Sequence, residues 1–446
     1  MKLALIGGGG FRAPLVYSAL LDTAGRIDLD EIVLHDLERD RLARIEPVLE
    51  GLASEHENHL PFRSTTDLRE AVEGASFVFC AIRVGQLAGR VVDENVPLSN
   101  GVLGQETTGP GGICFALRTI PAMVEIAETT AEHAPEAWLI NFTNPAGMVT
   151  EAVQQVLGER AIGICDSPSG LCRRVAAALG IAAGELNFDY FGLNHLGWLS
   201  GARQRGRNLL PDLLADGSRL ESFEEGRLFG GEWLRSLGMI PNEYLYYFYY
   251  NSDTIDAVLQ SAQSRGAYLL DQQSEFYSTN GGSAELALEA WRTTRHDRER
   301  TYMAEARAAA GAEGDHDTVD NAGYEAEAVA VLEAIALNKC EVLILNTANR
   351  SSLPFLDETA VVEVPTVVGR GGPVPMSTPA VPLHARALIE AMKDVERTTI
   401  EAALTRSSER AITALALHPL VPSVSKARSI FEGYKARQPE LQEAFS

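Results

Sequence analysis

The chain has 446 residues, of which 61 are acidic and 38 are basic, and its formal net charge is −23. This negative charge repels nucleic acids and anionic membrane surfaces, so we expect neither as a partner. No run of about 18 apolar residues is present, which argues against a membrane span. The first residues already form an apolar strand pattern, which argues against a secretion signal. The cysteines are odd in number and scattered, which favours free thiols in a reducing cytoplasm: Cys80, Cys114, Cys165, Cys172 and Cys340.

The first predicted element is a buried strand over residues 2–6, which runs into four consecutive glycines at 7–10. Glycines after a strand allow a tight turn and a close approach of the backbone to a pyrophosphate. Residues 11–24 then predict a helix whose N-terminus would face the phosphates. A second strand over 32–36 ends at Asp36, where a carboxylate would accept hydrogen bonds from an adenosine ribose and repel the 2′-phosphate of NADP.

This turn departs from the dinucleotide fingerprint. With Gly7 and Gly9 as the first two glycines of G-x-G-x-x-G, the third position is Arg12. The alternative is a glycine-rich turn that binds nothing, but the order of strand, glycines, helix, strand and acid favours a nucleotide. We therefore predict that NAD contacts Gly7, Gly8, Gly9, Phe11, Arg12 and Asp36.

Strands and helices continue to alternate, which is typical of a doubly wound parallel sheet of the Rossmann type. The further predicted strands are 77–82, 137–141 and 161–165, and the further helices are 38–54, 112–133 and 146–158. Residues 85–112 are predicted to form a long irregular binding loop at the edge of the sheet where ligands bind. Residues 1–180 are therefore predicted to be an NAD-binding domain of an α/β protein.

After Gly180 the pattern changes, and residues 181–446 are predicted to form a second, mixed α/β domain. The predicted elements are an extended segment over 186–199, helices over 283–310, 322–338, 380–415 and 422–437, and strands over 341–345 and 360–364. The polar residues 309–320 predict a mobile loop. Because no linker separates the two halves, we expect a ligand cleft between them.

Polar residues at the ends of predicted strands are candidates for chemistry. Asn141 and Asn144 suit contacts with the nicotinamide ribose or a sugar hydroxyl, or alternatively a helix N-cap. Cys165 precedes a predicted helix, whose N-terminus would lower the pKa of the thiol and make a thiolate available as a metal ligand. The alternatives are that Cys165 is a small buried residue and that Asp166 beside it is an acid or an N-cap.

His195 is a lone histidine, and such residues are more often structural than metal-binding. Its separation from Cys165 is not a metal-motif spacing, and the pair would leave coordination positions for substrate or water oxygens. Residues 244–250 hold five tyrosines. A tract of this kind indicates a core or subunit interface, although a tyrosine near a divalent cation can serve as a base.

Several of these segments, taken together, resemble glycoside hydrolase family 4, and most of all its 6-phospho-glucosidases. The resemblance spans nearly the whole chain and rests on residues 82–85, 89–90, 104–112, 143–145, 165–166, 192–195, 241–250, 349–354 and 361–365. It implies a fold like that of lactate and malate dehydrogenases, with NAD⁺ and a divalent cation, usually Mn²⁺, as cofactors. The implied reaction is removal of a hydride from C3 of a sugar, loss of the C2 proton, elimination at C1, addition of water and return of the hydride.

The same resemblance implies roles for seven residues: Cys165 and His195 as metal ligands, Tyr244 as the base, Asp166 as the acid that assists the leaving group, and Arg90, Asn144 and Arg265 as substrate contacts. The chain also departs from the family at two places. It has Phe11 and Arg12 after its glycines, where many members have Ser or Thr. It has Asp166 where many β-specific members have Asn. Both departures bear on the identity of the substrate.

We therefore expect a cytoplasmic homodimer or homotetramer that hydrolyses a small anionic glycoside, a glucoside with an anionic group at C6. A 6-phosphate is the first expectation, and a 6-sulfonate, as in the NAD-dependent sulfoquinovosidases, is the second. A 2-hydroxy-acid dehydrogenase is a further alternative, although it would leave Cys165 and Tyr244 unused and would release NADH. The last alternative is an NAD sensor without turnover.

Overall fold

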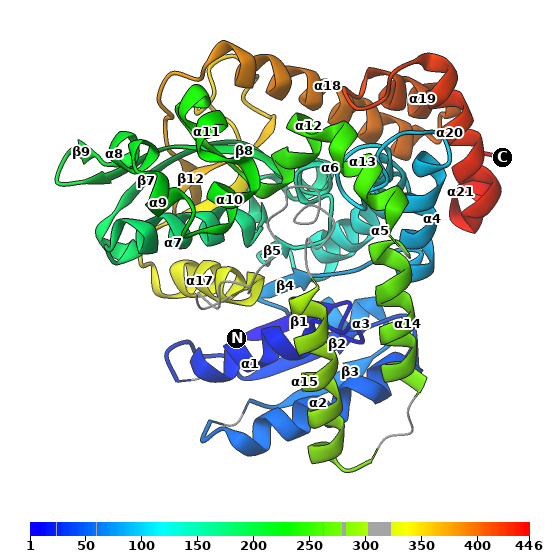
Figure 1. Cartoon of the computed structure of the whole chain (residues 1–446). Helices are drawn as coiled ribbons and strands as arrows, with labels where there is room; N and C mark the ends of the chain where they lie inside the picture. Colours follow the sequence, from blue (N-terminus) through cyan, green and yellow to red (C-terminus); the bar gives the residue numbers. More distant parts are fainter. Residues whose placement is uncertain (24, 59, 262, 279–281, 302–322) are drawn as a thin grey trace.

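The computed structural model describes residues 1–446 apart from 24, 59, 262, 279–281 and 302–322, and shows an α/β fold (Figure 1). Nine strands of the described chain form one sheet, in the order β13-β12-β11-β6-β5-β4-β1-β2-β3. Their bounds are β1 (Lys2–Ile6), β2 (Glu31–His35), β3 (Phe62–Thr65), β4 (Phe77–Cys80), β5 (Trp138–Asn141), β6 (Ala161–Gly163), β11 (Glu341–Ala348), β12 (Val361–Gly369) and β13 (Gly372–Pro375).

Strands β1 to β6 pair in parallel, in the order 3-2-1-4-5-6 of a doubly wound nucleotide-binding sheet. The prediction of a Rossmann-type α/β fold is therefore confirmed. Strands β11, β12 and β13 extend this sheet with antiparallel pairing, and β11 meets β6 where Asn346 faces Gly163. The second half of the chain thus contributes strands to the sheet of the first, and the predicted division at residue 180 stays a prediction.

Helices of the first half pack on both faces of the parallel strands. They are α1 (Ala13–Thr23), α2 (Arg39–Glu55), α3 (Leu68–Val72), α4 (Gln86–Leu98), α5 (Pro110–His133), α6 (Ala146–Leu157), η1 (Gly158–Arg160) and α7 (Ser167–Leu179). The expectation of an irregular segment over 85–112 was wrong, because α4 occupies half of it. The helix buries charged residues in ion pairs, such as Asp93 with Arg118 at 2.8 Å, so its sequence lacks an apolar stripe.

The extended segment predicted over 186–199 is a hairpin rather than one strand. It belongs to a small second sheet made of β7 (Asn187–Leu193), β8 (Leu196–Gln204), β9 (Arg207–Asn208) and β10 (Ile240–Pro241). The tight turn between β7 and β8 consists of Asn194 and His195, and His195 has a φ of 60°. The hairpin therefore fixes the backbone of His195 in a left-handed conformation.

The remaining helices lie in the second half of the chain. They are η2 (Ala183–Glu185), α8 (Leu210–Ala215), α9 (Gly217–Leu220), α10 (Glu224–Phe229), α11 (Gly231–Leu237), η3 (Glu243–Leu245), α12 (Tyr246–Tyr249), α13 (Asn251–Gln260), α14 (Arg265–Ser278), α15 (Ala284–Arg300), α17 (Tyr324–Leu337), α18 (Leu383–Thr405), α19 (Ser408–Leu417), α20 (Val424–Arg437) and α21 (Pro439–Ala444). The helix predicted over 380–415 is broken into α18 and α19, because Arg406 has a φ of 55° and Ser407 caps α19. The mobile loop predicted over 309–320 lies outside the described residues.

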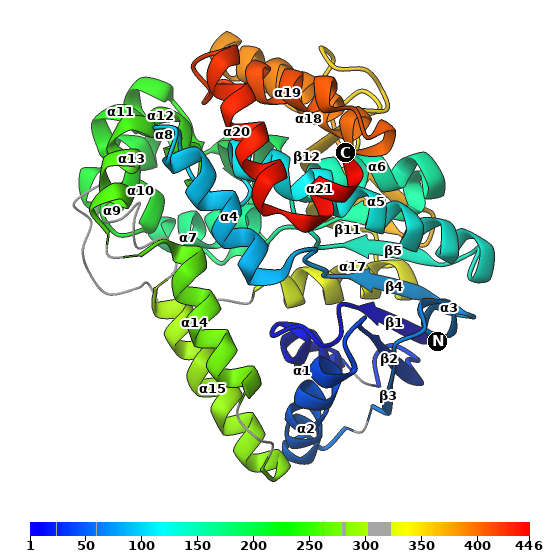
Figure 2. The same cartoon turned by 90° about the vertical axis from the view of Figure 1, so that its right-hand side faces the viewer.

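Helices α14 and α15 lie side by side and extend along the nucleotide-binding half of the sheet (Figure 2). The Tyr277 hydroxyl donates a hydrogen bond to Gly9 O, and Trp291 Nε1 donates one to Phe11 O, both at 2.8 Å. The Phe11 ring meets Phe276 edge-on, with 5.3 Å between the ring centroids. The two helices are therefore fastened to the glycine-rich turn after β1.

No helix within the described ranges is long and apolar enough to cross a membrane. All five cysteines are free thiols, and Cys340 is the exposed member of the set. The free thiols agree with the expectation from the cysteine pattern, and the compartment itself stays a prediction.

Candidate active site

A cavity of about 1450 Å³ opens at the carboxyl edge of the parallel sheet. Its walls include residues that follow β1, β2, β4, β5 and β6, together with residues of η3, α14 and α15. Eleven of the predicted site residues line it: Gly7, Phe11, Arg12, Asp36, Arg90, Asn144, Cys165, Asp166, His195, Tyr244 and Arg265. The cleft expected between the two halves of the chain is therefore present, and it brings nearly all of the candidate residues together.

The glycine-rich turn after β1 is shaped by close backbone contacts. Gly7 has a φ of 89°, and a Cβ there would lie 2.6 Å from Ala81 O. Gly7 N and Gly8 N both donate to His35 O, at 2.9 and 2.8 Å. A Cβ at Gly8 would lie 2.7 Å from Leu34 Cβ, so this glycine, which does not itself line the cavity, lets the turn pack tightly on β2. Only glycine fits these positions.

The carboxylate of Asp36 is held in place at the end of β2. Its Oδ2 accepts a hydrogen bond from Gly9 N at 3.1 Å, and its Oδ1 accepts one from Glu38 N at 3.2 Å. A Cβ at Gly9 would lie 2.8 Å from Asp36 Oδ2, which explains the third glycine. Asp36 therefore presents a positioned acceptor to the cavity, which is what the hydroxyls of an adenosine ribose require.

Asn141, like Gly8 and Gly9, is a predicted cofactor contact that does not line the cavity. It is fully buried, and its Nδ2 donates to Thr143 O at 3.2 Å and to Thr150 Oγ1 at 3.1 Å. Its Oδ1 accepts from Thr143 N at 2.8 Å. The side chain thus organises the loop after β5, and the contact expected between Asn141 and a nicotinamide ribose is not carried further.

Asn144 and Asp166 have side chains that do not cap the helices they precede. Asn144 Oδ1 is buried and has no hydrogen-bond partner among the described residues, and the first turn of α6 instead uses Asn194 Oδ1, which accepts from Ala146 N at 3.2 Å. Asp166 precedes α7, and its side chain makes no capping hydrogen bond there. Both side chains therefore remain available to a ligand in the cavity.

His195 and Tyr244 are stacked face to face, with 3.6 Å between ring centroids and 4° between ring planes. His195 Nδ1 lies 3.1 Å from Thr107 Oγ1, which leaves Nε2 as the nitrogen for a cation. Burial lowers the pKa of His195 to about 3, so the imidazole is neutral, the form that binds metals. This arrangement places the imidazole ring of His195 and the phenol ring of Tyr244 in van der Waals contact.

Cys165 also lines the cavity, but the expectation of a lowered pKa at a helix N-terminus was wrong. The thiol is 5 % exposed, and burial, together with the nearby Glu363 and Asp166, raises its pKa well above the usual range. A thiolate there needs a cation beside it, and a bound divalent cation deprotonates such a thiol. The described residues contain no cluster of three or more His, Cys, Asp or Glu side chains that would hold a metal alone. A thiol and a neutral imidazole in the wall of one cavity fit an exchangeable divalent cation that takes further oxygens from its substrate.

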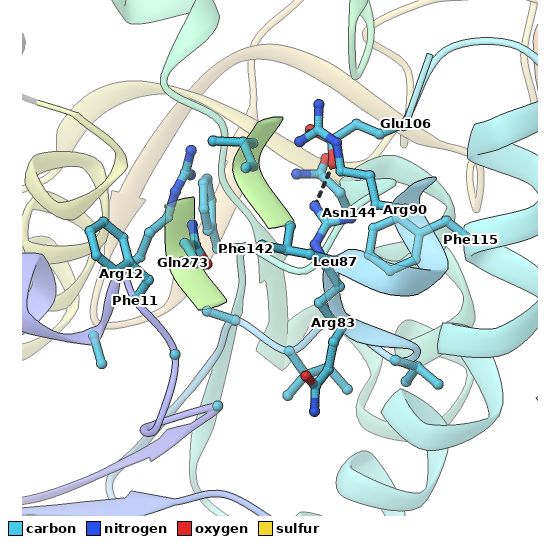
Figure 3. A pocket seen from close by; sticks show the side chains of 18 of the residues that line it. Phe11, Arg12, Arg83, Leu87, Arg90, Glu106, Phe115, Phe142, Asn144 and Gln273 are labelled. Carbon is cyan, nitrogen blue, oxygen red and sulfur yellow. Dashed lines mark hydrogen bonds and ion pairs between the residues drawn. The ribbon is translucent and has the colours of Figure 1, made fainter. Parts of the chain in front are cut away.

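One wall of the cavity carries a cluster of ion pairs (Figure 3). Arg83 Nη2 lies 2.5 Å from Glu106 Oε2, and Arg90 Nη1 lies 2.9 Å from Glu106 Oε1. Arg90 Nε also contacts Glu94 Oε1 at 2.7 Å, and Glu94 Oε2 accepts from Gly266 N at the start of α14. Burial raises the pKa of Glu106, but the neighbouring charges of Arg83 and Arg90 lower it by more, so the carboxylate stays ionised between the two guanidinium groups.

Further arginines reach the cavity from α14, α15 and the turn after β1. Arg265 Nη2 donates to Arg298 O at 2.8 Å, and Arg265 Nη1 contacts Thr301. Burial and the neighbouring cations Arg12, Arg90 and Arg265 lower the pKa of Arg298 well below its usual range. Cations crowded in this way favour an anionic ligand, which relieves their mutual repulsion.

Sequence reasoning missed Arg83, Glu106 and Arg298 as cavity residues. Arg83 and Glu106 lie in segments that carry the family resemblance, and this could have marked both as candidate cavity residues. Arg298 lies in a helix rich in Ala, Glu and Arg, and no local pattern distinguishes it from its exposed neighbours.

Comparison with known proteins assigns the chain to a family. The Family 4 glycosyl hydrolase profile matches residues 2–181, and the profile of the Family 4 glycosyl hydrolase C-terminal domain matches residues 190–421. The chain belongs to glycosyl hydrolase family 4. It is 30 % identical to a maltose-6′-phosphate glucosidase of Bacillus subtilis over 447 aligned residues, which cover 97 % of this chain and 94 % of the relative.

Solved structures of the family are similar over the whole chain. The 6-phospho-β-glucosidase of Thermotoga maritima, solved with NAD and glucose-6-phosphate, has a TM-score of 0.83 at 27 % identity and covers 99 % of both chains. A 6-phospho-α-glucosidase from gut microorganisms, solved with NAD and Mn²⁺, has a TM-score of 0.82 at 26 % identity and covers 98 % of this chain and 97 % of that one. The family resemblance inferred from the sequence is therefore confirmed, and both predicted cofactors are present in solved relatives.

Proposed function

We propose that this member of family 4 hydrolyses glucosides that carry a phosphate at C6, with NAD⁺ and Mn²⁺ as cofactors. The observation that carries the proposal is the arginine cluster, which shares one cavity with the fixed Asp36 carboxylate and with Cys165 and His195. Relatives that match almost the full chain include maltose-6′-phosphate glucosidase, 6-phospho-α-glucosidase and 6-phospho-β-glucosidase. A cytoplasmic location and a homo-oligomeric state stay predictions.

Binding of the cofactors is assigned to two parts of the cavity. Gly7 and Asp36 would hold the pyrophosphate and adenosine ribose of NAD⁺, with Arg12 beside the turn. Cys165 Sγ and His195 Nε2 would hold the cation. When bound, NAD⁺ exchanges a hydride with C3 of the sugar and the cation polarises the C2 and C3 oxygens.

The chain's own residues supply binding and proton transfer. Arg90 and Arg265 would bind the C6 anion, and Asn144 Oδ1 would accept from a sugar hydroxyl. Tyr244 would take the proton from C2, because its ring lies against that of His195. A negative charge on Tyr244 raises the pKa of Arg90, so the two side chains attract each other when the phenol is ionised. The same attraction means that Arg90 stabilises the phenolate that a tyrosine base must form. Asp166 would assist departure of the group at C1.

The test is to assay nitrophenyl glucosides, both anomers, that are unmodified, 6-phosphorylated or carry a 6-sulfonate. With NAD⁺ and Mn²⁺ present, we expect cleavage of a 6-phosphorylated glucoside without net formation of NADH. Deuterium at C3 or C2 of the sugar should slow the reaction. Preferential cleavage of the sulfonate would identify the sulfoquinovosidase alternative, and equal cleavage of the unmodified glucoside would refute the anionic pocket. Net NADH formation would favour a dehydrogenase, and full activity after removal of the dinucleotide would refute the redox mechanism.

Asp36→Asn should weaken NAD⁺ binding by about tenfold, because a hydrogen bond to a charged acceptor is worth about 1.5–3 kcal/mol and the neutral amide retains part of it. The same change should narrow the preference for NAD⁺ over NADP⁺, since the repulsion of the 2′-phosphate is lost. Calorimetric titration with each dinucleotide measures both effects. Asp40→Asn, which changes an exposed carboxylate outside the cavity, is the control. An unchanged ratio of the two dissociation constants would exclude Asp36 from the ribose site.

A further inference from the structure

Glu243 is a buried carboxyl group in the cavity that the proposed mechanism leaves unused. It begins η3, one residue before Tyr244, and is 4 % exposed. Asn242 Oδ1 accepts a hydrogen bond from Tyr244 N at 3.0 Å, and Asn242 N donates to Gly197 O at 2.9 Å. This turn is therefore anchored to strand β8, and the fold fixes where the Glu243 side chain lies.

The two carboxyl oxygens of Glu243 have different surroundings. Oε1 accepts a hydrogen bond from Ser167 Oγ at 2.6 Å. Oε2 is buried and has no hydrogen-bond partner in the described part of the chain. Glu243, Ser167 and Asp166 all line the cavity, and Ser167 directly follows Asp166. The unpaired oxygen thus belongs to a residue of the cavity wall that contacts the neighbour of Asp166, the residue assigned to the leaving group.

Arg174 does not satisfy this carboxyl group, because it is committed to another one. Arg174 Nε donates to Glu225 Oε2 at 3.0 Å, and Arg174 Nη2 contacts Glu225 Oε1. Burial raises the pKa of Glu243 to about 8; Arg174 opposes this effect, and Glu225 and Glu224 add to it. Burial therefore favours the protonated form of Glu243. Ser167 is the partner of Oε1, and Oε2 has no hydrogen-bond partner in the described protein.

We propose that the unpaired Oε2 of Glu243 forms a hydrogen bond with a hydroxyl group of the substrate's leaving group, and that it thereby selects leaving groups that are themselves sugars. This inference rests on the proposed function and on the role assigned to Asp166. A buried polar atom without a hydrogen-bond partner is unfavourable, so a substrate that supplies the partner is preferred over one that does not. A sugar carries hydroxyl groups beside the glycosidic bond, whereas a nitrophenyl ring carries no oxygen there.

The test compares kcat/KM for a 6′-phosphorylated disaccharide and for the 6-phosphorylated nitrophenyl glucoside of the same anomer, with NAD⁺ and Mn²⁺ present. In Glu243→Met, which keeps the length of the side chain and removes both oxygens, we expect the ratio of disaccharide to nitrophenyl kcat/KM to fall about tenfold. Glu243→Gln reproduces the acceptor and the donor of the protonated acid, so its ratio should stay within about threefold of the wild-type value. Glu221→Met, on an exposed carboxylate outside the cavity, is the matched surface control.

An unchanged ratio in Glu243→Met would overturn the proposal, and so would an equal fall in the Met and Gln variants. Equal losses on both substrates would also overturn it, because they would show a purely structural role; thermal unfolding midpoints report such damage directly. Failure of the wild-type protein to cleave either phosphorylated substrate would refute the proposed function and this inference with it. Cleavage of both with an unaltered ratio in every variant would refute the inference alone.

Discussion

Tyr244→Phe is expected to lower kcat by about 10²–10⁴-fold, the range that a positioned general base contributes. The phenol is fixed by its stack on His195 and lies near Arg90, so the substitution removes one hydroxyl and keeps the ring packing. NAD⁺ binding and the thermal unfolding midpoint should stay at wild-type values. Exchange of the sugar C2 proton with solvent deuterium, followed by NMR, should be lost in proportion to kcat.

Tyr250→Phe is the matched control for this experiment. Its hydroxyl donates to Phe229 O at 3.0 Å, and the residue does not line the cavity. Its loss should therefore affect stability slightly and the rate of exchange hardly at all. Wild-type exchange in Tyr244→Phe would remove Tyr244 from the role of base and would direct attention to another group in the cavity.

Cys165→Ser is expected to weaken Mn²⁺ binding by about 100-fold or more, since a neutral hydroxyl is a poor ligand and even changes outside the ligand set cost about 10–100-fold. Burial already raises the pKa of the thiol, and a hydroxyl in the same place is still harder to ionise. The free Mn²⁺ signal in electron paramagnetic resonance measures the dissociation constant without turnover. His195→Gln should show a loss of similar size.

Cys172→Ser controls for the removal of a buried sulfur, here from α7, the helix that begins two residues after Cys165. Cys172 is 5 % exposed and does not line the cavity, so its serine variant should bind Mn²⁺ as the wild type does. If both serine variants bound the cation equally well, Cys165 would be a packing residue and the cation would lie elsewhere.

The parallel sheet was predictable because each of its strands, apart from β3, is a short apolar run followed by a helix pattern. Helix α4 was missed for the opposite reason, since Arg90, Asp93 and Glu94 are buried and an apolar stripe is lacking. Local sequence gave no indication that α14 and α15 dock on the glycine turn. The contacts from Tyr277 to Gly9 and from Trp291 to Phe11 join residues 268 and 280 positions apart, and no local pattern reports them.

The candidate site also combines features that local sequence predicts with features that depend on distant residues. Asp36 and Cys165 follow strands of the parallel sheet, so their place at its carboxyl edge followed from the fold class. His195 lies in the hairpin between β7 and β8 of the second sheet, so its place in the cavity did not follow from the fold class. The role of Asn141 was mistaken, because its position at a strand end suits both a ligand contact and the loop hydrogen bonds that it makes. The state of the Cys165 thiol depends on burial and on Glu363, which lies 198 residues away in sequence and is invisible to motif reasoning.

The continuous sheet has a practical consequence for dissecting this protein. A fragment ending at residue 180 would lack β11, so the backbone N–H and C=O groups of β6 on that side would be unpaired. Such an exposed strand can pair with other copies of the fragment. The fragment would also lack Val361 N and Lys393 Nζ, which both donate hydrogen bonds to Glu151 Oε2 at 2.8 Å. The carboxylate of Glu151, buried in the whole protein, would then have no compensating charge. The nucleotide-binding half should therefore aggregate when produced alone, and cofactor affinity has to be measured on the intact polypeptide.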